Sequence, residues 1–389
     1  MFGNIIGWAH TPFGKLAGES LESLITRVTL DALAHAHLEA RDIDEIVIGH
    51  FNQGMDPQGS PASLVLQADS GLRFTPSTRV ENACATGSAA VRQASSLIAS
   101  GQAKIVLVVG VEKMTAATEE AVRQALVSAS YVAEEGGAQA SFVGLFADIT
   151  QQYFSRYGDQ SHALACIAAK NHHNGSINPL AHLRKSLDVS FCGQESASNP
   201  YVVKPLRRTD CSLVSDGAAA LVLACDDVAM RREQRISIRA QVQVNDYLPI
   251  SRRDITRFEG ASKAWHKALS MASLTLDDLN FVETHDCFTI AELIEYEAMG
   301  LTLPGQGAKA ILEGLTQPDG RLPVNLSGGL KAKGHPIGAT GVSMHVLTAM
   351  QLAGESPGLQ LTNTPSLGGL FNMGGAAVAN YVSILERTR

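Results

Sequence analysis

Several features that define other classes of protein are missing from this sequence. No apolar run approaches the roughly 20 residues that span a bilayer, and residues 1–10 lack the basic head and apolar core of a signal peptide. The basic residues form no stripe, and the net charge is −7, which argues against a nucleic-acid partner. We therefore expect a soluble, cytoplasmic protein that binds neither membranes nor nucleic acid.

Paired cysteines are also missing. The six cysteines include no Cys-x-x-C pair, and a chain of 389 residues in a reducing compartment has no need of disulfides. With 45% hydrophobic residues, the chain can bury a large core without them. Any cysteine with a function should therefore be a free thiol.

What the sequence does contain is an α/β alternation. Short β-branched runs, typical of buried strands, alternate with longer Ala-rich helical patterns. The expected strands include 46–48, 105–109, 221–223 and 281–282, and the expected helices include 21–38 and 89–100. The pattern predicts the α/β fold class.

A weak internal repeat divides the chain into two similar halves. Three pairs of segments match in order: 43–48 with 277–282, 85–88 with 339–342, and 217–222 with 374–379. The second and third segments lie about 97 residues further apart in the first half, so an insertion interrupts that half. We predict one half at 1–113 and 209–230, an inserted segment at 114–208, and a second half at 231–389. Turn signals fall within the insertion at Asn174-Gly175 and Asn178-Pro179.

Cys84 is a candidate nucleophile. It lies in Asn-Ala-Cys-Ala-Thr-Gly-Ser, where an expected strand turns into a helix of small residues. The unpaired N–H groups of a helix start favour a thiolate, so we expect a lowered thiol pKa, and the same groups can hold an oxyanion. On this motif alone, a buried cysteine that packs a tight turn is the alternative.

A second motif surrounds His335. Gly-His-Pro-Ile-Gly-Ala-Thr-Gly opens a helix, and its glycines allow close approach of the backbone to a ligand. A phosphate-binding loop is the rival interpretation. The Gly-Lys-Ser/Thr ending of a P-loop and the dinucleotide fingerprint are both absent, which argues against it.

The third motif is His285-Asp286-Cys287-Phe288, directly after an expected strand. Titratable residues at the carboxyl end of a strand are typical of α/β active sites. An amphipathic helix through Glu292, Glu295 and Glu297 should follow. Taken alone, the motif also permits a structural interpretation, with His285 as a helix cap and Cys287 in the core.

Together these three motifs, in this order, resemble the thiolase superfamily, and most closely its sterol-carrier-protein type. The likeness runs along nearly the whole chain and includes 101–114 and 215–219. It implies a five-layered αβαβα fold, built from two duplicated βαβαβαββ halves with a loop domain inserted in the first. It also implies a homodimer, in some relatives a dimer of dimers, and a possible small partner with a zinc ribbon and an OB fold.

One departure from the commonest thiolases is informative. They carry a second catalytic cysteine in a Cys-x-Gly loop near the C-terminus, where this chain has Asn372-Met373-Gly374. In the sterol-carrier-protein type the second cysteine comes from the His-Asp-Cys-Phe motif, which supplies Cys287. His285 then replaces an asparagine that the commonest thiolases use through a water molecule.

The resemblance implies a role for each candidate. His335 would activate Cys84, which takes an acyl group from coenzyme A, and Cys287 would deprotonate a second acyl-CoA. His285 and His335 would hold the enolate oxygen, and the N–H groups of Cys84 and Gly374 would hold the acyl oxygen. No bound cofactor or metal is expected, since acyl-CoA is the substrate.

Contacts to that substrate are expected from four residues. By resemblance Ser212 touches the pantetheine arm, and Phe288 lines either the acyl pocket or the core. Arg184 and Lys185 are suited to the nucleotide phosphates, although their charges fit an ordinary solvated loop equally well.

Other classes of function stay open at this point. Cys84, Cys287, His285 and His335 have the composition of a zinc site, although short ligand spacings are absent. A non-catalytic acyl-CoA binding subunit is a further class, and the presence of both cysteines and both histidines argues against it. Among enzymes, the runner-up is a thiolase-like acyltransferase or retro-aldolase with an unusual acceptor.

Overall fold

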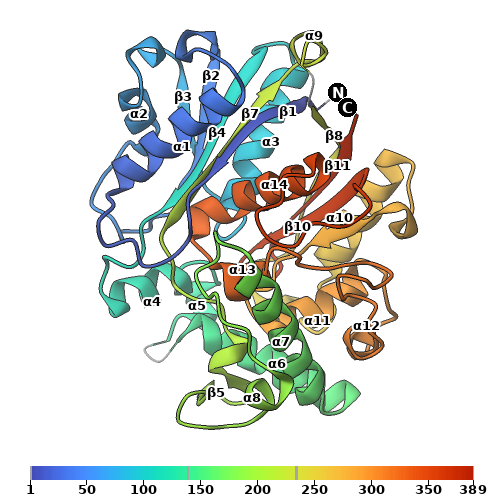
Figure 1. Ribbon diagram of the computed structural model, residues 1–389. Coiled ribbons are helices and arrows are strands. Elements are labelled where there is room, and N and C mark those ends of the chain that lie inside the picture. Colours follow the sequence, from blue (N-terminus) through green and yellow to red (C-terminus); the bar gives the residue numbers. More distant parts are fainter. Residues whose placement is uncertain (1, 138–139, 233–234, 389) are drawn as a thin grey trace.

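Most strands of the described residues form one long sheet (Figure 1). The computed structural model describes residues 2–137, 140–232 and 235–388, and within them nine strands run in the order β3-β2-β4-β7-β1-β8-β11-β10-β9. The bounds are β1 (Asn4–His10), β2 (Glu45–Gly49), β3 (Ser77–Val80), β4 (Ile105–Glu112), β7 (Gly217–Ala224), β8 (Ile236–Asn245), β9 (Phe281–Glu283), β10 (Leu367–Gly374) and β11 (Ala379–Arg387).

The sheet consists of two half-sheets that meet at one short seam. β1 pairs with β8 only through Asn4 with Ser237 and Ile5 with Ile236. On one side lie β3-β2-β4-β7-β1, and on the other β8-β11-β10-β9, with a bridge from Val282 to Val324 in place of a further strand. The second half thus repeats the first with one strand reduced to a bridge, which confirms the duplication predicted from the sequence.

Helices form three layers around the half-sheets. α1 (Leu21–His35) packs on β1, β4 and β7, and α10 (Glu259–Ala272) packs on β8 and β11. Between the half-sheets, α3 (Thr86–Ala99) packs along α14 (Ile337–Ala353), which also contacts β4, β7 and β10. The predicted five-layered thiolase architecture is therefore confirmed.

Sequence explains which helix occupies which layer. In α1, buried Leu21, Leu24, Ile25 and Val28 recur at helical spacing, so one face meets the sheet. α14 is buried along nearly its whole length, as expected of a central helix. Its close approach to α3 depends on Gly87, where a Cβ would lie 2.5 Å from the backbone nitrogen of Val342.

The segment between β4 and β7 forms a helical layer at one end of the sheet. It contains α4 (Glu119–Val127), α5 (Val132–Glu135), α6 (Phe142–Tyr157), α7 (Ser161–Ile177), α8 (Val189–Gly193) and the ribbon of β5 (Tyr201–Val203) and β6 (Leu206–Arg207). α7 packs on three helices of the second half, α11 (Thr289–Ala298), α12 (Gly307–Leu312) and α13 (Gly329–Lys333). The short helices α2 (Pro61–Leu64) and α9 (Asp226–Ala229) lie in the first half.

Two local predictions are wrong. Asn174-Gly175 is not a turn but part of α7, because Asn174 Nδ2 donates to the Asn325 carbonyl and Gly175 allows the approach of Ala332. α11 is not amphipathic, because all ten of its residues are buried. Glu297 and Glu292 bond buried partners on α6 and α7, and Glu295 accepts from Thr284 after β9.

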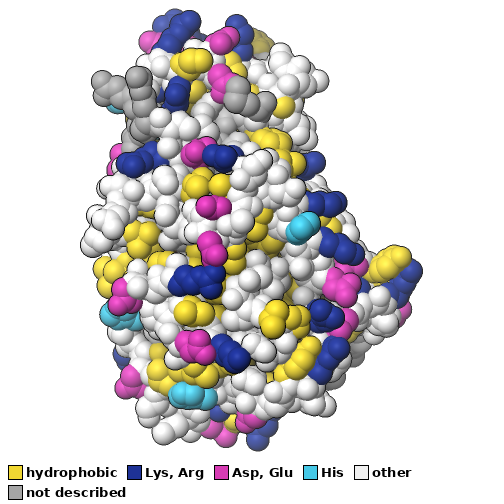
Figure 2. All heavy atoms as spheres, turned by 90° about the vertical axis from the view of Figure 1, so that its right-hand side faces the viewer, with side chains coloured by type: hydrophobic (Ala, Val, Ile, Leu, Met, Phe, Trp, Pro, Cys, Tyr) yellow, Lys and Arg dark blue, Asp and Glu magenta, His cyan; other side chains and the backbone are white. Residues whose placement is uncertain are grey.

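The surface shows no accumulation of one charge on the face seen in Figure 2, where lysine and arginine alternate with aspartate, glutamate and apolar side chains. Across the described residues, no helix is both long and apolar enough to cross a bilayer.

Candidate active site

Cys84 lies at the tip of the turn between β3 and α3. Ala83 adopts a positive φ of 48°, and the nitrogens of Ala85 and Thr86 donate to the carbonyls of Asn82 and Ala83. Thr86 Oγ1 accepts from the Asn82 nitrogen at 2.8 Å, which ties both ends of the turn together. This strained elbow projects the sulfur forward from the start of the helix.

His335 precedes α14 and is held from two sides. Its backbone nitrogen donates to Ser215 Oγ at 3.3 Å. Thr340 Oγ1 donates to the Pro336 carbonyl, so its oxygen accepts from His335 Nδ1 at 2.7 Å. The ring proton of neutral His335 therefore lies on Nδ1. Nε2 is buried, accepts no hydrogen bond from the described residues, and is free to act as a base.

His285 follows β9 and has the opposite tautomer. Asn372 Nδ2 donates to the Cys84 carbonyl at 3.1 Å and lies 2.8 Å from His285 Nδ1. The Cys84 carbonyl fixes the orientation of the amide, so Nδ1 of His285 must accept. The ring proton of His285 is therefore on Nε2, which makes this atom a donor.

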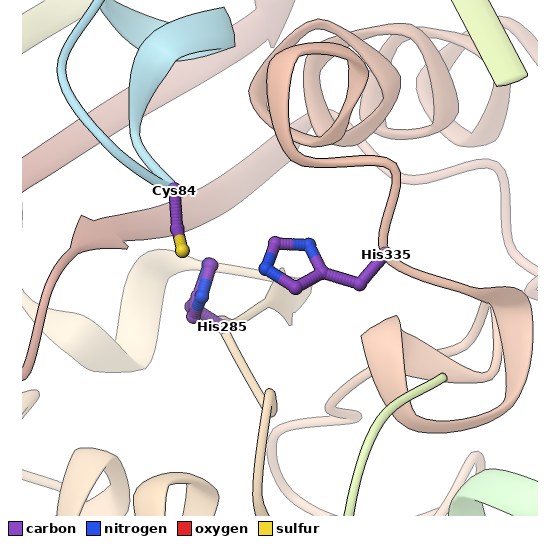
Figure 3. A group of neighbouring side chains, drawn as sticks. All are labelled: Cys84, His285 and His335. Carbon is purple, nitrogen blue, oxygen red and sulfur yellow. The ribbon is translucent and has the colours of Figure 1, made fainter. Parts of the chain in front are cut away.

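These three side chains meet at one point (Figure 3). The Cys84 sulfur and one ring nitrogen from each histidine lie within 4.8 Å of one another, although they come from the turn before α3, the loop after β9 and the loop before α14. The two imidazoles meet edge to face with ring centres 5.1 Å apart. The site thus combines a thiol, an acceptor nitrogen and a donor nitrogen in one buried space.

Both imidazoles are uncharged. Burial, followed by the nearby Lys333 ammonium, lowers the pKa of His335 to about 3. Burial, His335 and Lys333 together hold the pKa of His285 well below its usual value. Neutral rings are what the tautomer assignment requires, since a protonated ring would offer two donors and no base.

The expected low pKa of Cys84 is wrong for this closed site. Burial raises the pKa of the thiol to about 12, and hydrogen bonds from the backbone of Gly375 and of Cys84 lower it only in part. Desolvation of the thiolate outweighs the partial positive charge of the helix start. Cys84 is therefore a neutral thiol at rest, and its proton must leave during attack.

Two backbone N–H groups lie at the Cys84 sulfur. The N–H groups that interact with the Cys84 sulfur belong to Cys84 itself and to Gly375. The donor proposed at Gly374 stays a prediction. A Cβ on Gly374 would lie 2.4 Å from the Asn82 carbonyl, so this glycine allows β10 to approach the elbow.

Cys287 lies beside this group. Burial, and next the neighbouring Cys84 sulfur, raise the pKa of Cys287 well above its usual value, so the two thiols are close enough to interact. The Ser212 nitrogen donates to the Cys287 carbonyl at 2.9 Å, and Cys211 forms a β-bridge with Phe288. The structure therefore brings Ser212 to the His-Asp-Cys-Phe motif, while its contact with the pantetheine arm stays a prediction.

Phe288 is buried and contributes to an aromatic cluster. Its ring stacks on Phe146 of α6 at 4.4 Å between centres, and Phe146 meets Phe142 at 5.5 Å. Phe142 borders an open cavity of about 620 Å³ between α4, α5 and α6. Phe288 thus packs against α6 at the position directly after Cys287.

Arg184 and Lys185 are exposed and lie near the catalytic loop. The nitrogens of His182 and Leu183 donate to the carbonyls of Lys333 and Ala332, so this basic segment runs beside the residues that lead to His335. No ion pair is found for either cation among the described residues. Whether they bind the nucleotide phosphates stays a prediction.

Two positioning residues escaped the sequence analysis. Thr340 and Asn372 each fix one imidazole tautomer. Asn372 was noted only because it stands where other family members have a cysteine. The i+5 spacing of Thr340 from His335, on the first turn of a helix, could have indicated the contact.

A buried thiol beside two neutral imidazoles, on a duplicated α/β fold, defines an enzyme of the thiol-dependent acyl-transfer class. The chain belongs to the thiolase family, since residues 4–227 match the thiolase N-terminal domain and residues 243–387 match the thiolase C-terminal domain-like family.

Relatives agree along the whole chain. The acetyl-CoA acetyltransferase of Methanothermobacter thermautotrophicus is 36% identical, over 98% of this chain and 99% of the relative. Sterol carrier protein 2 of Homo sapiens is 30% identical, over 96% of this chain and 70% of that protein. The solved Ltp2-ChsH2(DUF35) aldolase shares the fold with a TM-score of 0.84 at 21% identity, over 100% of this chain and 98% of that one.

Proposed function

We propose that this chain is an acyl-CoA C-acyltransferase of the thiolase type, which condenses an acyl-CoA with acetyl-CoA reversibly and cleaves 3-ketoacyl-CoA with coenzyme A. The observation that carries the proposal is the meeting of the Cys84 sulfur with the His285 and His335 nitrogens within 4.8 Å. The relative named acetyl-CoA acetyltransferase, 36% identical over nearly all of both chains, supports the substrate class.

The first half-reaction transfers the acyl group to Cys84. His335 Nε2 takes the thiol proton while the sulfur attacks the thioester carbonyl, and the N–H groups of Cys84 and Gly374 or Gly375 hold the oxygen. A carbon–sulfur bond to Cys84 forms, the bond to coenzyme A breaks, and His335 returns the proton to the departing coenzyme A thiolate. The charges balance without a cofactor.

The second half-reaction forms the carbon–carbon bond. His335 Nε2 first takes the thiol proton of Cys287, and the resulting Cys287 thiolate removes a proton from Cα of acetyl-CoA. The donor Nε2 of His285 and the now protonated Nε2 of His335 hold the enolate oxygen. The enolate carbon attacks the acyl carbonyl, the bond to the Cys84 sulfur breaks, and His335 returns its proton to the Cys84 thiolate, which restores both thiols. In the degradative direction Cys287 protonates the departing carbanion.

Coenzyme A binding is assigned to residues around the same space. We infer that Ser212 contacts the pantetheine arm, that Phe288 borders the acyl group, and that exposed Arg184 and Lys185 meet the nucleotide phosphates. The inserted segment 114–208 would then act as the loop domain that covers the substrate, between the first half (1–113 and 209–230) and the second half (231–389).

Assembly follows from the edge of the sheet. β3 pairs with β2 on one side and with no strand on the other within the described residues, and it leads directly into the Cys84 turn. We infer a homodimer through this edge, with a dimer of dimers as a further step. We also infer a small partner with a zinc ribbon and an OB fold, and the DUF35 component named with the Ltp2-ChsH2 aldolase supports the presence of a partner. The expected compartment is the cytoplasm.

Two variants test the assigned roles. Cys84→Ala should abolish release of coenzyme A from acyl-CoA, because no acyl-enzyme can form. Cys287→Ala should retain a single stoichiometric release and lose condensation. Quenched-flow measurement of free thiol separates the two outcomes, and equal residual turnover in both variants refutes the roles. Thiolysis of a chain-length series of 3-ketoacyl-CoA by the wild-type protein tests the reaction itself.

Zinc binding is the second candidate, because Cys84, His285 and His335 offer three ligand atoms within 4.8 Å. Against it, the Lys333 ammonium lies close enough to depress the pKa of both histidines and would repel a dication. Elemental analysis of the purified protein decides between them, since stoichiometric zinc would overturn the thiol mechanism.

A retro-aldolase with an unusual acceptor would instead cleave a 3-hydroxyacyl-CoA without added coenzyme A.

A further inference from the structure

Asp286 stands between the two candidate catalytic residues of its motif and is fully buried. Its carboxylate accepts three hydrogen bonds. The Leu330 nitrogen donates to Oδ1 at 2.6 Å, the Lys331 nitrogen donates to Oδ2 at 3.2 Å, and Asn171 Nδ2 donates to Oδ2 at 2.7 Å. No catalytic step assigned above uses this carboxylate.

The carboxylate takes the place of a missing helix cap. Leu330 and Lys331 are in the first turn of α13, whose N-cap is Gly328, a residue without a side chain to accept from them. Gly329 has a φ of 59°, and a Cβ there would lie 2.2 to 2.5 Å from the carboxyl atoms of Asp286. Two consecutive glycines therefore leave the space and the donors for a carboxylate from another segment.

This contact joins the two parts of the active site. The turn of Asp286 carries His285 and Cys287, and α13 ends at Lys333, two residues before His335. Displacement of the carboxylate would move His285 and Cys287 relative to His335, whereas Thr340 and Ser215 would still hold His335 near Cys84.

The inserted segment supports the carboxylate from behind. Asn171 of α7 donates to both Asp286 and Glu292 of α11, and Glu292 forms a buried ion pair with Lys170. Burial, with Glu292 next in effect, raises the pKa of Asp286 well above its usual value, and the Leu330 and Lys331 nitrogens lower it. Because Asp286 is buried, its carboxylate relies on these three donors for its hydrogen bonds, and the loss of any one of them is costly.

We propose that Asp286 is a positioning residue for carbon–carbon bond formation: by capping α13 it sets the place of His285 and Cys287 relative to His335. The inference rests on the proposed function, because it separates that function's two half-reactions. Acylation of Cys84 needs His335 and backbone N–H groups. Proton removal from Cα needs Cys287 and His285, which the carboxylate holds in position.

The test measures the half-reactions separately in the full-length protein. Acylation is followed as the burst of coenzyme A released from acetyl-CoA, and proton removal as deuterium exchange from solvent into the acetyl methyl group. In Asp286→Asn, the amide Nδ2 must face at least one of the three donors in either orientation and loses that hydrogen bond. Exchange should fall about a hundredfold, as expected of a small misplacement, while the burst amplitude stays near the wild-type value.

Two more variants approach the contact from the other side. Gly329→Ala pushes the carboxylate away without changing it, and should give the same loss of exchange with a retained burst. Asn171→Ala removes one of the three donors, so it should lower the rate of deuterium exchange by a smaller factor and also retain the acylation burst. Glu283→Gln is the matched control, since this buried carboxylate bonds Ser327 and not α13. It should lower both half-reactions by the same factor or neither.

Different outcomes separate the inference from the function on which it rests. A wild-type protein with neither burst nor exchange overturns the proposed function. An active wild type, with variants at Asp286 and Gly329 that lose burst and exchange in equal proportion, overturns the positioning role and leaves the function intact. Equal loss in Glu283→Gln and Asp286→Asn, with the same split, also overturns it.

Discussion

Asn372 Nδ2 lies 2.8 Å from Nδ1 of His285, so a side chain in the position of the missing loop cysteine dictates which nitrogen of the neighbouring imidazole carries the proton. The same amide donates to the Cys84 carbonyl at 3.1 Å. One residue therefore links the Cys84 turn to the proposed enolate donor. The amide has two hydrogens and can make both contacts, whereas a thiol at this position has only one hydrogen to donate.

Asn372→Asp should invert the tautomer of His285. A carboxylate can only accept, so it draws the ring proton to Nδ1 and leaves Nε2 without a hydrogen to donate to the enolate. Loss of one oxyanion donor typically costs about 10²- to 10³-fold in rate. We expect a loss of this size in acetyl-CoA condensation, with the acylation burst retained.

The control for this variant is Asn372→Ala, which removes the contact and imposes no tautomer. It should keep more condensation than Asn372→Asp, because the neutral ring can still place its proton on Nε2. Nitrogen NMR of labelled histidine reports the tautomer directly. A ring with Nε2–H in Asn372→Asp would contradict the assignment.

Each buried histidine with a lowered pKa should make the free energy of unfolding depend on pH, and a variant at one of them should reveal its contribution. Burial lowers the pKa of His345 to about 4, while the unfolded chain protonates near 6.5. Below pH 6.5 the unfolded state binds the extra proton, so the free energy of unfolding falls by about 1.4 kcal/mol per pH unit for each such group, until the folded pKa is reached. Buried carboxyls with raised pKa values, such as Glu295, act in the opposite sense.

Because these effects oppose one another, the quantity to compare between wild type and variant is the slope of the free energy of unfolding against pH. His345 lies in α14, away from the catalytic group, and bonds Gly341 and Ser383. His345→Gln should lose some stability at pH 7. Between pH 6 and 5, the slope of its unfolding free energy against pH should be smaller than that of the wild type by the contribution of one bound proton, about 1.4 kcal/mol per pH unit. Chemical denaturation at several pH values gives the slope. Identical slopes in wild type and variant would show that the folded ring is protonated.

Chain-length preference should depend on the stacked pair Phe146 and Phe288. Both rings are buried, and Phe288 directly follows the proposed base. Phe146→Ala removes one ring and leaves space beside Phe288, so longer acyl groups should fit. A pocket change of this kind shifts relative kcat/KM by roughly tenfold or more for each added methylene. Thiolysis of a series of 3-ketoacyl-CoA substrates measures the shift.

Phe142→Ala serves as the control for that experiment. Phe142 touches Phe146 from the cavity side and does not stack on Phe288. It should enlarge the outer cavity without changing the order of substrate preference. The same shift in both variants would mean that general loosening of α6, and not the stacked ring, controls the acyl group.

The sequence predicted most of what local chemistry decides. Cys84, His285 and His335 each follow a strand or precede a helix, where motifs of a few residues fix the backbone. What it missed depends on contacts between distant segments. The sequence predicts an amphipathic helix through Glu292, but its partner Lys170 lies 122 residues earlier, and the pair is buried because α7 packs on α11. The predicted low pKa of Cys84 is wrong for the same reason, because the start of a helix can be recognised in the sequence but the burial of the thiol cannot.

The contact between the two central helices should limit the stability of the whole fold. α3 follows Cys84 and α14 follows His335, and they touch where Gly87 faces Val342 and Gly341. A Cβ on Gly87 would lie 2.5 Å from one backbone nitrogen and 2.7 Å from the other, and backbone atoms cannot rotate away. Gly87→Ala should therefore cost at least the roughly 1–3 kcal/mol of an overpacked core and lower Tm accordingly. Gly59→Ala, where a Cβ meets nothing within 4 Å, is the control and should change Tm little.

Because separation of the helices also separates the nucleophile from its base, Gly87→Ala should slow acylation even below its Tm. A variant as stable and as fast as wild type would show that the helices have room to move apart.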